Sequence, residues 1–398
     1  MTLSPRKEKL INVAVVIGGF FVAFVLAEVV LRVFFPAHVT PDRRLGWIAH
    51  QGGGWDVRGW RNALPLDQAN IVAIGDSMTM GDDVTRVTRE EAWPQVLGSL
   101  ASTSVYQMAL GGYGPVQYDA LLDEAIPLHP KIVLVGFYLG NDLYDVYRMV
   151  YERDAYPELR DPSFTPSPWK FQDNAGYSEA WNGVDTTSRI YQLWQLTAWP
   201  RLHSRIWGLL NNGVWLPFAN RMGWIEVDAP KLERMKTFSA SHPEITLVYP
   251  DPGLETVLNS GYRLNTVKLD TNTLEAWRIA QNRFRDMDQR LTQEGVRFVI
   301  VIIPTKEMVY ETHMRSAGES LPSGYTGIFA SEMLLRKEIF TFCEEAHISC
   351  IDTLPDLAKK LDEKVMIYQH TIDGHPNAMG YDAIAKTVYQ YIKKHKFL

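Results

Sequence analysis

Five apolar, strand-like runs, most of them continuous, alternate with helical patterns along most of the chain, and this alternation limits the fold more than any other feature. The runs are IVAIG (71–75), SVYQMAL (104–110), KIVLVGFY (131–138), RFVIVII (297–303) and ISCID (348–352). Continuous apolar runs of this length are typical of strands that are covered on both faces. Strands that alternate with helices predict a parallel sheet in a doubly wound α/β domain.

The length and charge of the chain exclude some classes of protein. A chain of 398 residues with 46% hydrophobic content can bury one large core or two modest ones. The formal net charge of -6 comes without long runs of one sign, which argues against a surface that binds nucleic acid. We therefore expect a folded protein with no nucleic-acid partner.

Residues 10–27 (LINVAVVIGGFFVAFVLA) form an apolar stretch near the N-terminus. Eighteen helical residues span about 27 Å, close to the ~30 Å hydrocarbon core of a bilayer. A cleaved signal peptide is the alternative, although the run exceeds the roughly 7 to 15 apolar residues of such peptides. Arg6, Lys7 and Lys9 favour a cytoplasmic N-terminus. We predict a single-pass anchor with the large domain outside the cytoplasm.

Residues 150–270 are far longer than an ordinary crossover between parallel strands. This segment holds seven tryptophans: Trp169, Trp181, Trp194, Trp199, Trp207, Trp215 and Trp224. Clustered aromatic side chains form a small satellite core more often than a binding platform. We interpret the segment as an inserted subdomain.

The two cysteines, Cys343 and Cys350, lie seven residues apart where a predicted helix passes into the last strand. An oxidising compartment would permit a disulfide there. Two buried, unlinked thiols are an equally good interpretation.

Polar residues follow each strand at the edge where a doubly wound sheet binds its ligands. Ser77 follows the first run, Gly112 the second and Asn141 the third, and Asp373 and His375 precede the final helical pattern. Acyl transfer requires a hydroxyl, a base, a group that orients the base and donors for an oxyanion. We predict Ser77 as nucleophile, His375 as base and Asp373 as its orienter. The N–H groups of Ser77 and Gly112 and the Asn141 amide would form the oxyanion hole.

Four sequence blocks resemble those of the GDSL, or SGNH, hydrolase superfamily. IGDSMTMG (74–81) is similar to the first block, ALGGYG (109–114) to the second, LGNDLYD (139–145) to the third and DGHPNAMGYDAIA (373–385) to the fourth. The blocks are similar to those of membrane-anchored members found in bacteria, and the resemblance leaves the aromatic insertion unassigned. It implies a flavodoxin-like, three-layer α/β/α fold and a serine ester hydrolase that uses no metal or other cofactor.

Three departures from the family pattern affect these expectations. Gln107 stands where the second block usually has Asn, and Met78 stands where Phe is frequent; we expect both to affect packing only. Asp373 lies two residues before His375 and not the usual three, so a backbone carbonyl is an alternative orienter.

The resemblance leaves three functional hypotheses. The first is an extracytoplasmic esterase that deacylates a cell-envelope glycan or lipid, held in the bacterial inner membrane with its domain in the periplasm. The second is an O-acyltransferase that modifies an exopolysaccharide or cell-wall glycan with a membrane protein as acyl donor. The third is a non-catalytic glycan-binding scaffold. The intact Ser, Gly, Asn and His argue against the third, and the lack of a fused multi-spanning domain favours hydrolysis.

These expectations divide the chain into six segments. They are a cytoplasmic N-terminus (1–9), a transmembrane anchor (10–35), a tether and domain lip (36–65), the first part of the hydrolase domain (66–149), the inserted subdomain (150–270) and the second part of the domain (271–398).

Overall fold

The computed structural model describes residues 5–34, 39–51, 54–81, 87–169 and 266–398, with shorter stretches at 196, 204–210, 214–215, 218, 221–222, 236, 239–240, 246–249, 251 and 253–259. Contacts between residues divide the chain into two compact units. The first consists of Met1–His38 and Ser178–Lys231, and the second of Val39–Tyr177 and Leu232–Leu398. Each unit is described by itself below.

The second unit is built on a parallel sheet of five strands in the order β4-β3-β5-β8-β9. The strands are β3 (Ile71–Gly75), β4 (Val105–Ala109), β5 (Ile132–Tyr138), β8 (Arg297–Ile303) and β9 (Ser349–Asp352). Each lies within one of the five apolar runs. When these five strands are numbered in chain order, their order in the sheet is 2-1-3-4-5, the flavodoxin-like order of a doubly wound sheet. The predicted fold class is confirmed.

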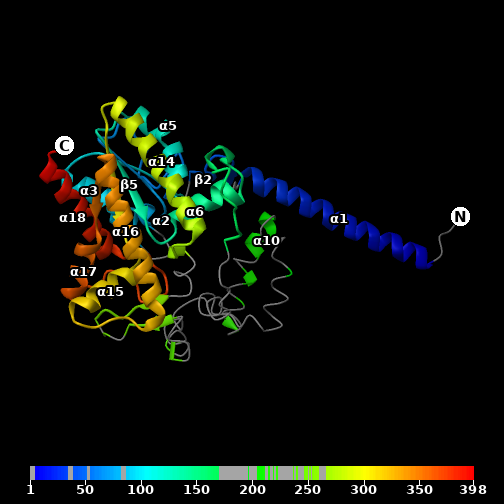
Figure 1. Cartoon of the computed structure of the whole chain (residues 1–398). Coiled ribbons are helices and arrows are strands. Elements are labelled where there is room, and N and C mark those ends of the chain that lie inside the picture. The colour runs from blue at the N-terminus through cyan, green and yellow to red at the C-terminus, as the bar shows by residue number, and fades with distance from the viewer. Residues whose placement is uncertain are drawn as a thin grey trace. The chain divides into compact units, whose positions relative to one another are not determined.

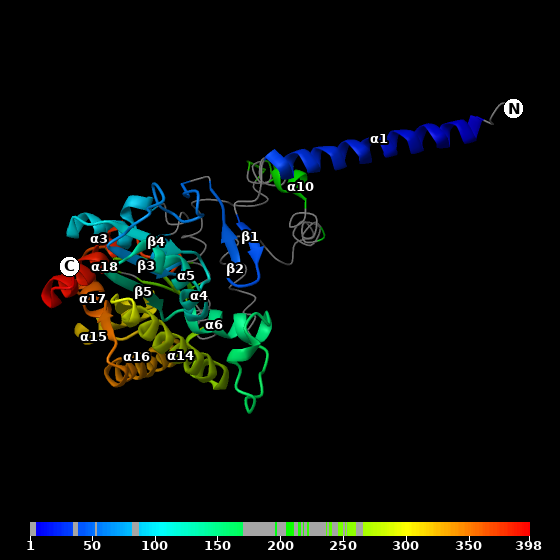
Figure 2. The ribbon, with the colours of Figure 1, turned by 90° about the horizontal axis from the view of Figure 1, so that it is seen from above.

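Helices cover both faces of this sheet, which gives the three layers seen in Figures 1 and 2. One face packs against α4 (Pro115–Ala120), α5 (Leu122–Ala125), α6 (Asp142–Tyr147), α14 (Thr271–Gln293) and α16 (Thr326–Ala346). The other packs against α3 (Trp93–Ala101), α15 (Lys306–Ser316), α17 (Leu354–Asp362) and α18 (Ala378–His395). Short 3-10 or π turns lie at Arg89–Glu91, Ile126–Leu128, Arg148–Glu152, Pro157–Leu159 and Ser323–Tyr325.

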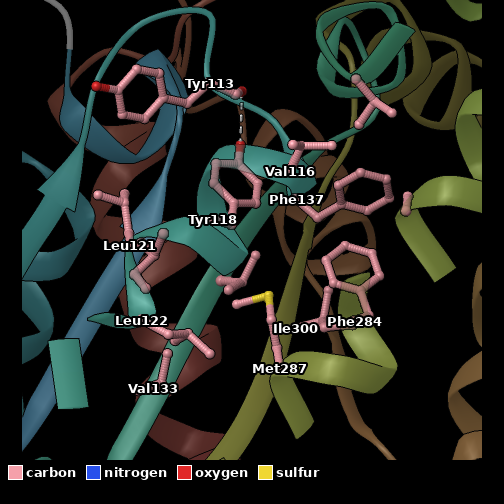
Figure 3. Packing of buried hydrophobic residues seen from close by; sticks show 14 of the residues in the cluster. Tyr113, Val116, Tyr118, Leu121, Leu122, Val133, Phe137, Phe284, Met287 and Ile300 are labelled. Carbon is pink, nitrogen blue, oxygen red and sulfur yellow. Dashed lines mark hydrogen bonds between the residues drawn. The ribbon is translucent and has the colours of Figure 1, made fainter. Parts of the chain in front are cut away.

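The core consists of two apolar layers, one on each face of the sheet. Every side chain of β5 is buried, as two-sided coverage requires. On the α14 face, Phe137 of β5 meets Phe284 edge to face at 5.3 Å between ring centroids, and Met287 and Ile300 pack below them (Figure 3). The hydroxyl of Tyr118 in the same layer donates to the Tyr113 carbonyl at 3.1 Å.

The segment after the first helix forms a small hairpin that packs on the α14 face. Its strands are β1 (Val39–Asp42) and β2 (Gly46–Ala49), which pair antiparallel. Figures 1 and 2 show β2 beside α6. Leu45 and Trp60 are both buried in the core of this face, so residues between 39 and 65 are part of the folded unit. A second antiparallel pair joins β6 (Thr246–Val248) to β7 (Val257–Asn259).

The first unit contains a long helix, α1 (Pro5–Phe34), of which Ile11–Leu31 is long and apolar enough to cross a membrane. Signal sequences near an N-terminus share these properties. A short helix, α10 (Arg205–Leu210), packs against α1: Ser204 Oγ and the Ile206 N–H donate to Glu28 Oε2 at 2.9 and 3.1 Å. A carboxylate at a helix N-terminus receives N–H groups that the helix leaves without internal partners.

Two features that the sequence left open fall in the second unit. Cys343 and Cys350 form a disulfide that links the end of α16 to β9. Of the insertion's tryptophans, Trp169 is buried in the main core between Tyr144 and Tyr147, each 5.2 Å away between ring centroids. Four others, Trp181, Trp194, Trp199 and Trp224, lie outside the described residues.

Candidate active site

Ser77 is the first residue of a one-turn helix, α2 (Ser77–Met80), that begins where β3 ends. Asp76 caps this turn by accepting the Met78 N–H at 2.9 Å. The turn lies directly on the sheet, because a Cβ at Gly75 or Gly136 would come within 2.1 Å of Thr79 Oγ1. These two glycines therefore let α2 pack against β3 and β5. This packing of α2 on the sheet holds Ser77 at the carboxyl edge of the strands.

His375 reaches Ser77 from the other end of the chain. Its Nε2 lies 2.8 Å from Ser77 Oγ, which is hydrogen-bond distance. Asn377, two residues on, caps α18 by accepting the N–H groups of Met379 and Gly380 at 2.9 and 3.1 Å. The start of α18 thus fixes the loop that carries the imidazole.

Asp373 contacts the opposite nitrogen of the same ring, 2.6 Å from His375 Nδ1. The same carboxylate oxygen accepts the His375 backbone N–H at 2.7 Å. This is an Asx turn, in which a side chain bonds the backbone two residues on. The turn explains how an acid only two residues before the histidine still reaches its ring.

The environment keeps Asp373 ionised. Burial alone would raise the pKa of its carboxyl, but the hydrogen bond and the charge of His375 outweigh burial and lower the pKa to about 2. An ionised carboxylate at Nδ1 holds the proton on that nitrogen and leaves Nε2 as acceptor toward Ser77.

The other predicted residues lie on the loops at the same edge. Strand register aligns Gly75 with Ala109 on β4 and with Gly136 on β5, so the loops that follow these strands are neighbours. A Cβ on Gly111 would lie 3.6 Å from Ser77 Cβ. The second block therefore passes directly beside the serine.

Each predicted oxyanion donor has an available hydrogen. Ser77 opens a helix, so its N–H lacks an internal partner. Gly112 has a φ of +73°, which favours glycine, and within the described residues no acceptor is hydrogen-bonded to its N–H. Asn141 precedes α6 and uses one amide hydrogen on Asp145 Oδ2 at 2.6 Å. An amide carries two hydrogens, so one remains.

Buried acids lie behind the serine. Burial raises the pKa of Asp76 to about 6, against the opposing charge of His375. Burial and the neighbouring Asp76 also raise the pKa of Asp142, whose Oδ2 lies 2.9 Å from the Tyr118 hydroxyl oxygen and accepts the Tyr138 N–H at 3.0 Å. Asp76 and Asp142 thus accept backbone N–H groups of the serine turn and of the end of β5.

Sequence reasoning missed Lys306, which is fully buried at the start of α15. Its Nζ donates to the carbonyl oxygens of Asp373 at 2.7 Å and Thr371 at 2.9 Å. The loop with the candidate acid is therefore fastened to a helix that carries none of the four blocks. A lysine after a buried strand, in PTKEMVY, was the available signal.

Gln107, the departure in the second block, is fully buried in β4. Its Nε2 donates to the Thr79 carbonyl at 2.9 Å. It thereby supports the turn that carries Ser77.

Within the described residues, no group of three or more His, Cys, Asp or Glu side chains could hold a metal ion.

Comparison with known proteins gives likeness at the level of fold. No protein-family model and no curated protein matches the sequence. Similar solved structures include an extracellular lipase from Streptomyces rimosus (10% identity, covering 81% of this chain and 99% of that one, TM-score 0.36). Others are a GDSL-like lipase from Bacteroides thetaiotaomicron (11%, 82% and 88%, 0.31) and an acetyl xylan esterase from the rumen bacterium Butyrivibrio proteoclasticus (9%, 85% and 67%, 0.33).

These likenesses are too distant to carry an activity, so we base the function on the contacts around Ser77. The sheet order and the four blocks, each at the carboxyl edge of the sheet, fit the GDSL/SGNH superfamily of serine ester hydrolases.

Proposed function

We propose that this chain is a serine ester hydrolase that acts through Ser77, His375 and Asp373. One observation carries the proposal: the His375 ring contacts two side chains at once. Its Nε2 lies 2.8 Å from Ser77 Oγ, and its Nδ1 lies 2.6 Å from Asp373 Oδ1. A hydroxyl, a base and an orienting acid in this order form the arrangement that activates a serine. A serine that only completed a turn would require neither partner.

The reaction follows from these contacts. Ser77 Oγ attacks the ester carbonyl carbon while its proton passes to His375 Nε2, and Asp373 stabilises the imidazolium that forms. The oxyanion of the tetrahedral intermediate accepts from the N–H groups of Ser77 and Gly112 and from the Asn141 amide. The alcohol leaves with the proton from His375. Water, deprotonated by the same imidazole, then releases the acid and restores Ser77.

The substrate and location remain proposals from the sequence. We propose an acylated glycan or lipid of the bacterial cell envelope as substrate. The long apolar helix α1 supports attachment to the inner membrane, with the catalytic unit on the periplasmic side. The disulfide between Cys343 and Cys350 supports an oxidising compartment.

The test is a panel of p-nitrophenyl esters with acetyl, butyryl and octanoyl chains, each with and without a free oligosaccharide acceptor. We expect release of p-nitrophenol by the wild type and none above background by Ser77→Ala. Acylated oligosaccharide formed faster than free acid would instead indicate an O-acyltransferase, whose natural donor would be a membrane protein. No turnover of any ester, and no labelling of Ser77 by a fluorophosphonate, would contradict the proposal.

A further inference from the structure

The loop with Gly112 is held by a side chain from the β1–β2 hairpin, which follows α1 in the sequence. Trp47 of β2 donates its Nε1–H to the Gly111 carbonyl at 3.0 Å. The Gly111 carbonyl and the Gly112 N–H belong to one planar trans peptide, so they point in opposite directions. By binding the oxygen, Trp47 therefore fixes the direction of the N–H on the other side of that peptide.

The Trp47 ring also defines the space around Gly112. A Cβ at Gly112 would lie 2.8 Å from Trp47 Cζ2 and 3.1 Å from Arg148 Nη2. The backbone of the hairpin is tied to the same loop, because the Tyr113 hydroxyl donates to the Trp47 carbonyl at 2.6 Å. The glycine loop and the hairpin thus hold one another in place.

A buried carboxylate orients the second donor. Asp145 Oδ2 accepts from Asn141 Nδ2 at 2.6 Å, and only about 2% of Asp145 is exposed. Burial raises the pKa of the Asp145 carboxyl to about 7, against the charge of Arg148. Above that pH the ionised carboxylate only accepts hydrogen bonds, so it selects the orientation in which the amide NH2, and not its oxygen, faces Asp145. The second hydrogen of the same NH2 group is then held in one plane.

Arg148 links the glycine loop to the acid that orients Asn141. Its Nη2 lies 2.6 Å from Asp145 Oδ1 and donates to the Gly112 carbonyl at 3.2 Å. Its guanidinium also lies over the Trp47 ring, 5.0 Å from the ring centroid. A single cation therefore contacts the acid that orients Asn141, the glycine that bears the other donor and the tryptophan that fixes that glycine.

We propose that Trp47, Asp145 and Arg148 are positioning residues that hold the Gly112 N–H and the Asn141 amide as one oxyanion hole. None of them touches the reacting atoms. The inference rests on the proposed ester hydrolysis and adds to it that the hairpin following the membrane helix completes the active site. Because oxyanion donors act mainly on the transition state, the loss should fall on kcat and not on KM.

The first experiment removes a single N–H. Trp47→Phe keeps an aromatic ring but cannot donate to Gly111, and we expect kcat on p-nitrophenyl acetate to fall about 10-fold with KM changed less than threefold. Trp93→Phe is the matched control, because Trp93 is buried and its Nε1 has no hydrogen-bond partner among the described residues. The control should lose thermal stability through poorer packing and keep kcat.

The second experiment breaks the ion pair. Arg148→Met should lower kcat about 10- to 100-fold, since small displacements of positioned groups carry losses of this size. Arg278→Met is the matched control: Arg278 pairs with the buried Glu275 at 2.7 Å with the same three-residue spacing, on α14. Both variants should lose stability, but only Arg148→Met should lose kcat. Arg148→Lys, which keeps the charge without the planar fork, should recover part of the loss.

A double variant tests whether the parts act together. The combined loss of kcat in Asn141→Ala with Arg148→Met should be smaller than the product of the two single losses, because Arg148 acts partly through Asn141. The inference would be overturned by unchanged kcat in Trp47→Phe and Arg148→Met, or by independent losses in the double variant. In either case, turnover by the wild type and by Arg278→Met would still support the proposed ester hydrolysis. A wild type inactive on every ester would overturn both.

Discussion

Replacing Asp373 tests the unusual spacing of the candidate acid and base. The pKa of its carboxyl falls from 3.8 to about 2 in the folded protein, chiefly through His375 once burial is overcome. A change of one pKa unit corresponds to about 1.4 kcal/mol, so the ionised carboxylate is favoured by about 2 kcal/mol. His375 becomes an imidazolium in the transition state, and Asp373→Ala would forfeit an interaction of this size. We expect kcat/KM to fall roughly 30-fold.

Asp373→Asn should be worse than Asp373→Ala, although asparagine resembles aspartate more closely. An amide NH2 facing Nδ1 would donate to it and move the ring proton to Nε2, where it blocks transfer from Ser77. A wrong tautomer of this kind costs on the order of 10⁴ in kcat in a serine triad. The assay is p-nitrophenyl acetate hydrolysis at pH 8, with circular dichroism as a check of folding.

Two results would refute this reasoning. If Asp373→Ala kept activity within threefold of wild type, a backbone carbonyl would be the orienter and the 2.6 Å contact would be incidental. If the Asn and Ala variants were equally active, the carboxylate would not control the tautomer. The lowered pKa also has a consequence for stability: Asp373 contributes fully above pH 4, and this part is lost as the pH falls through about 2.

Three further predictions concern the site and the anchor. Ser77→Ala and His375→Ala should each reduce turnover by several orders of magnitude, and the double variant should be little worse, because the two residues act as one unit; additive losses would contradict a shared role. Asn141→Ala should cost on the order of 3 kcal/mol in the transition state, measured as kcat/KM on the same ester. A protein that begins at Val39 should be soluble and active because it keeps Trp47, whereas the full chain should partition into detergent; full-length protein in the aqueous phase would refute the anchor.

The sheet could be predicted because most of its strands are buried on both faces and form nearly unbroken apolar runs in the sequence. Each of the five runs contains one strand, although the edge strand β9 is only partly buried. The carboxyl-edge rule then located Ser77, Gly112 and Asn141, since parallel strands deliver their following residues to one edge. Asp373 and His375 could be named from the fourth block, but the two-residue spacing left a backbone carbonyl as an alternative orienter, because the contact between the acid and the ring depends on an Asx turn.

The supporting residues were beyond prediction for a different reason. Trp47 acts across 64 residues of sequence on Gly111, and nothing local marks a tryptophan in a short exposed-looking strand as a donor to a distant carbonyl. Arg148 and Asp145 have an ordinary helical spacing that usually indicates a surface ion pair. Only the fold shows that this pair is buried against a glycine loop.

Lys306 offers a last test, of how the loop with Asp373 is held. Its ammonium is fully buried and donates to the carbonyls of Asp373 and Thr371. Lys306→Met keeps most of the volume but removes two hydrogen bonds from a charged donor, each worth about 1.5 to 3 kcal/mol. We expect the free energy of unfolding to fall by roughly 3 kcal/mol or more, measured by urea titration, and kcat to fall about 10-fold.

The exposed Lys337 on α16 provides the control, and Lys337→Met should change neither quantity. Loss of stability alone would be compatible with a merely structural lysine, so a second readout is needed. If Lys306 acts by holding the acid against His375, Asp373→Ala should cost less activity in the Lys306→Met background than in wild type, because the acid there is already displaced. An equal cost in both backgrounds would show that Asp373 keeps its place without Lys306.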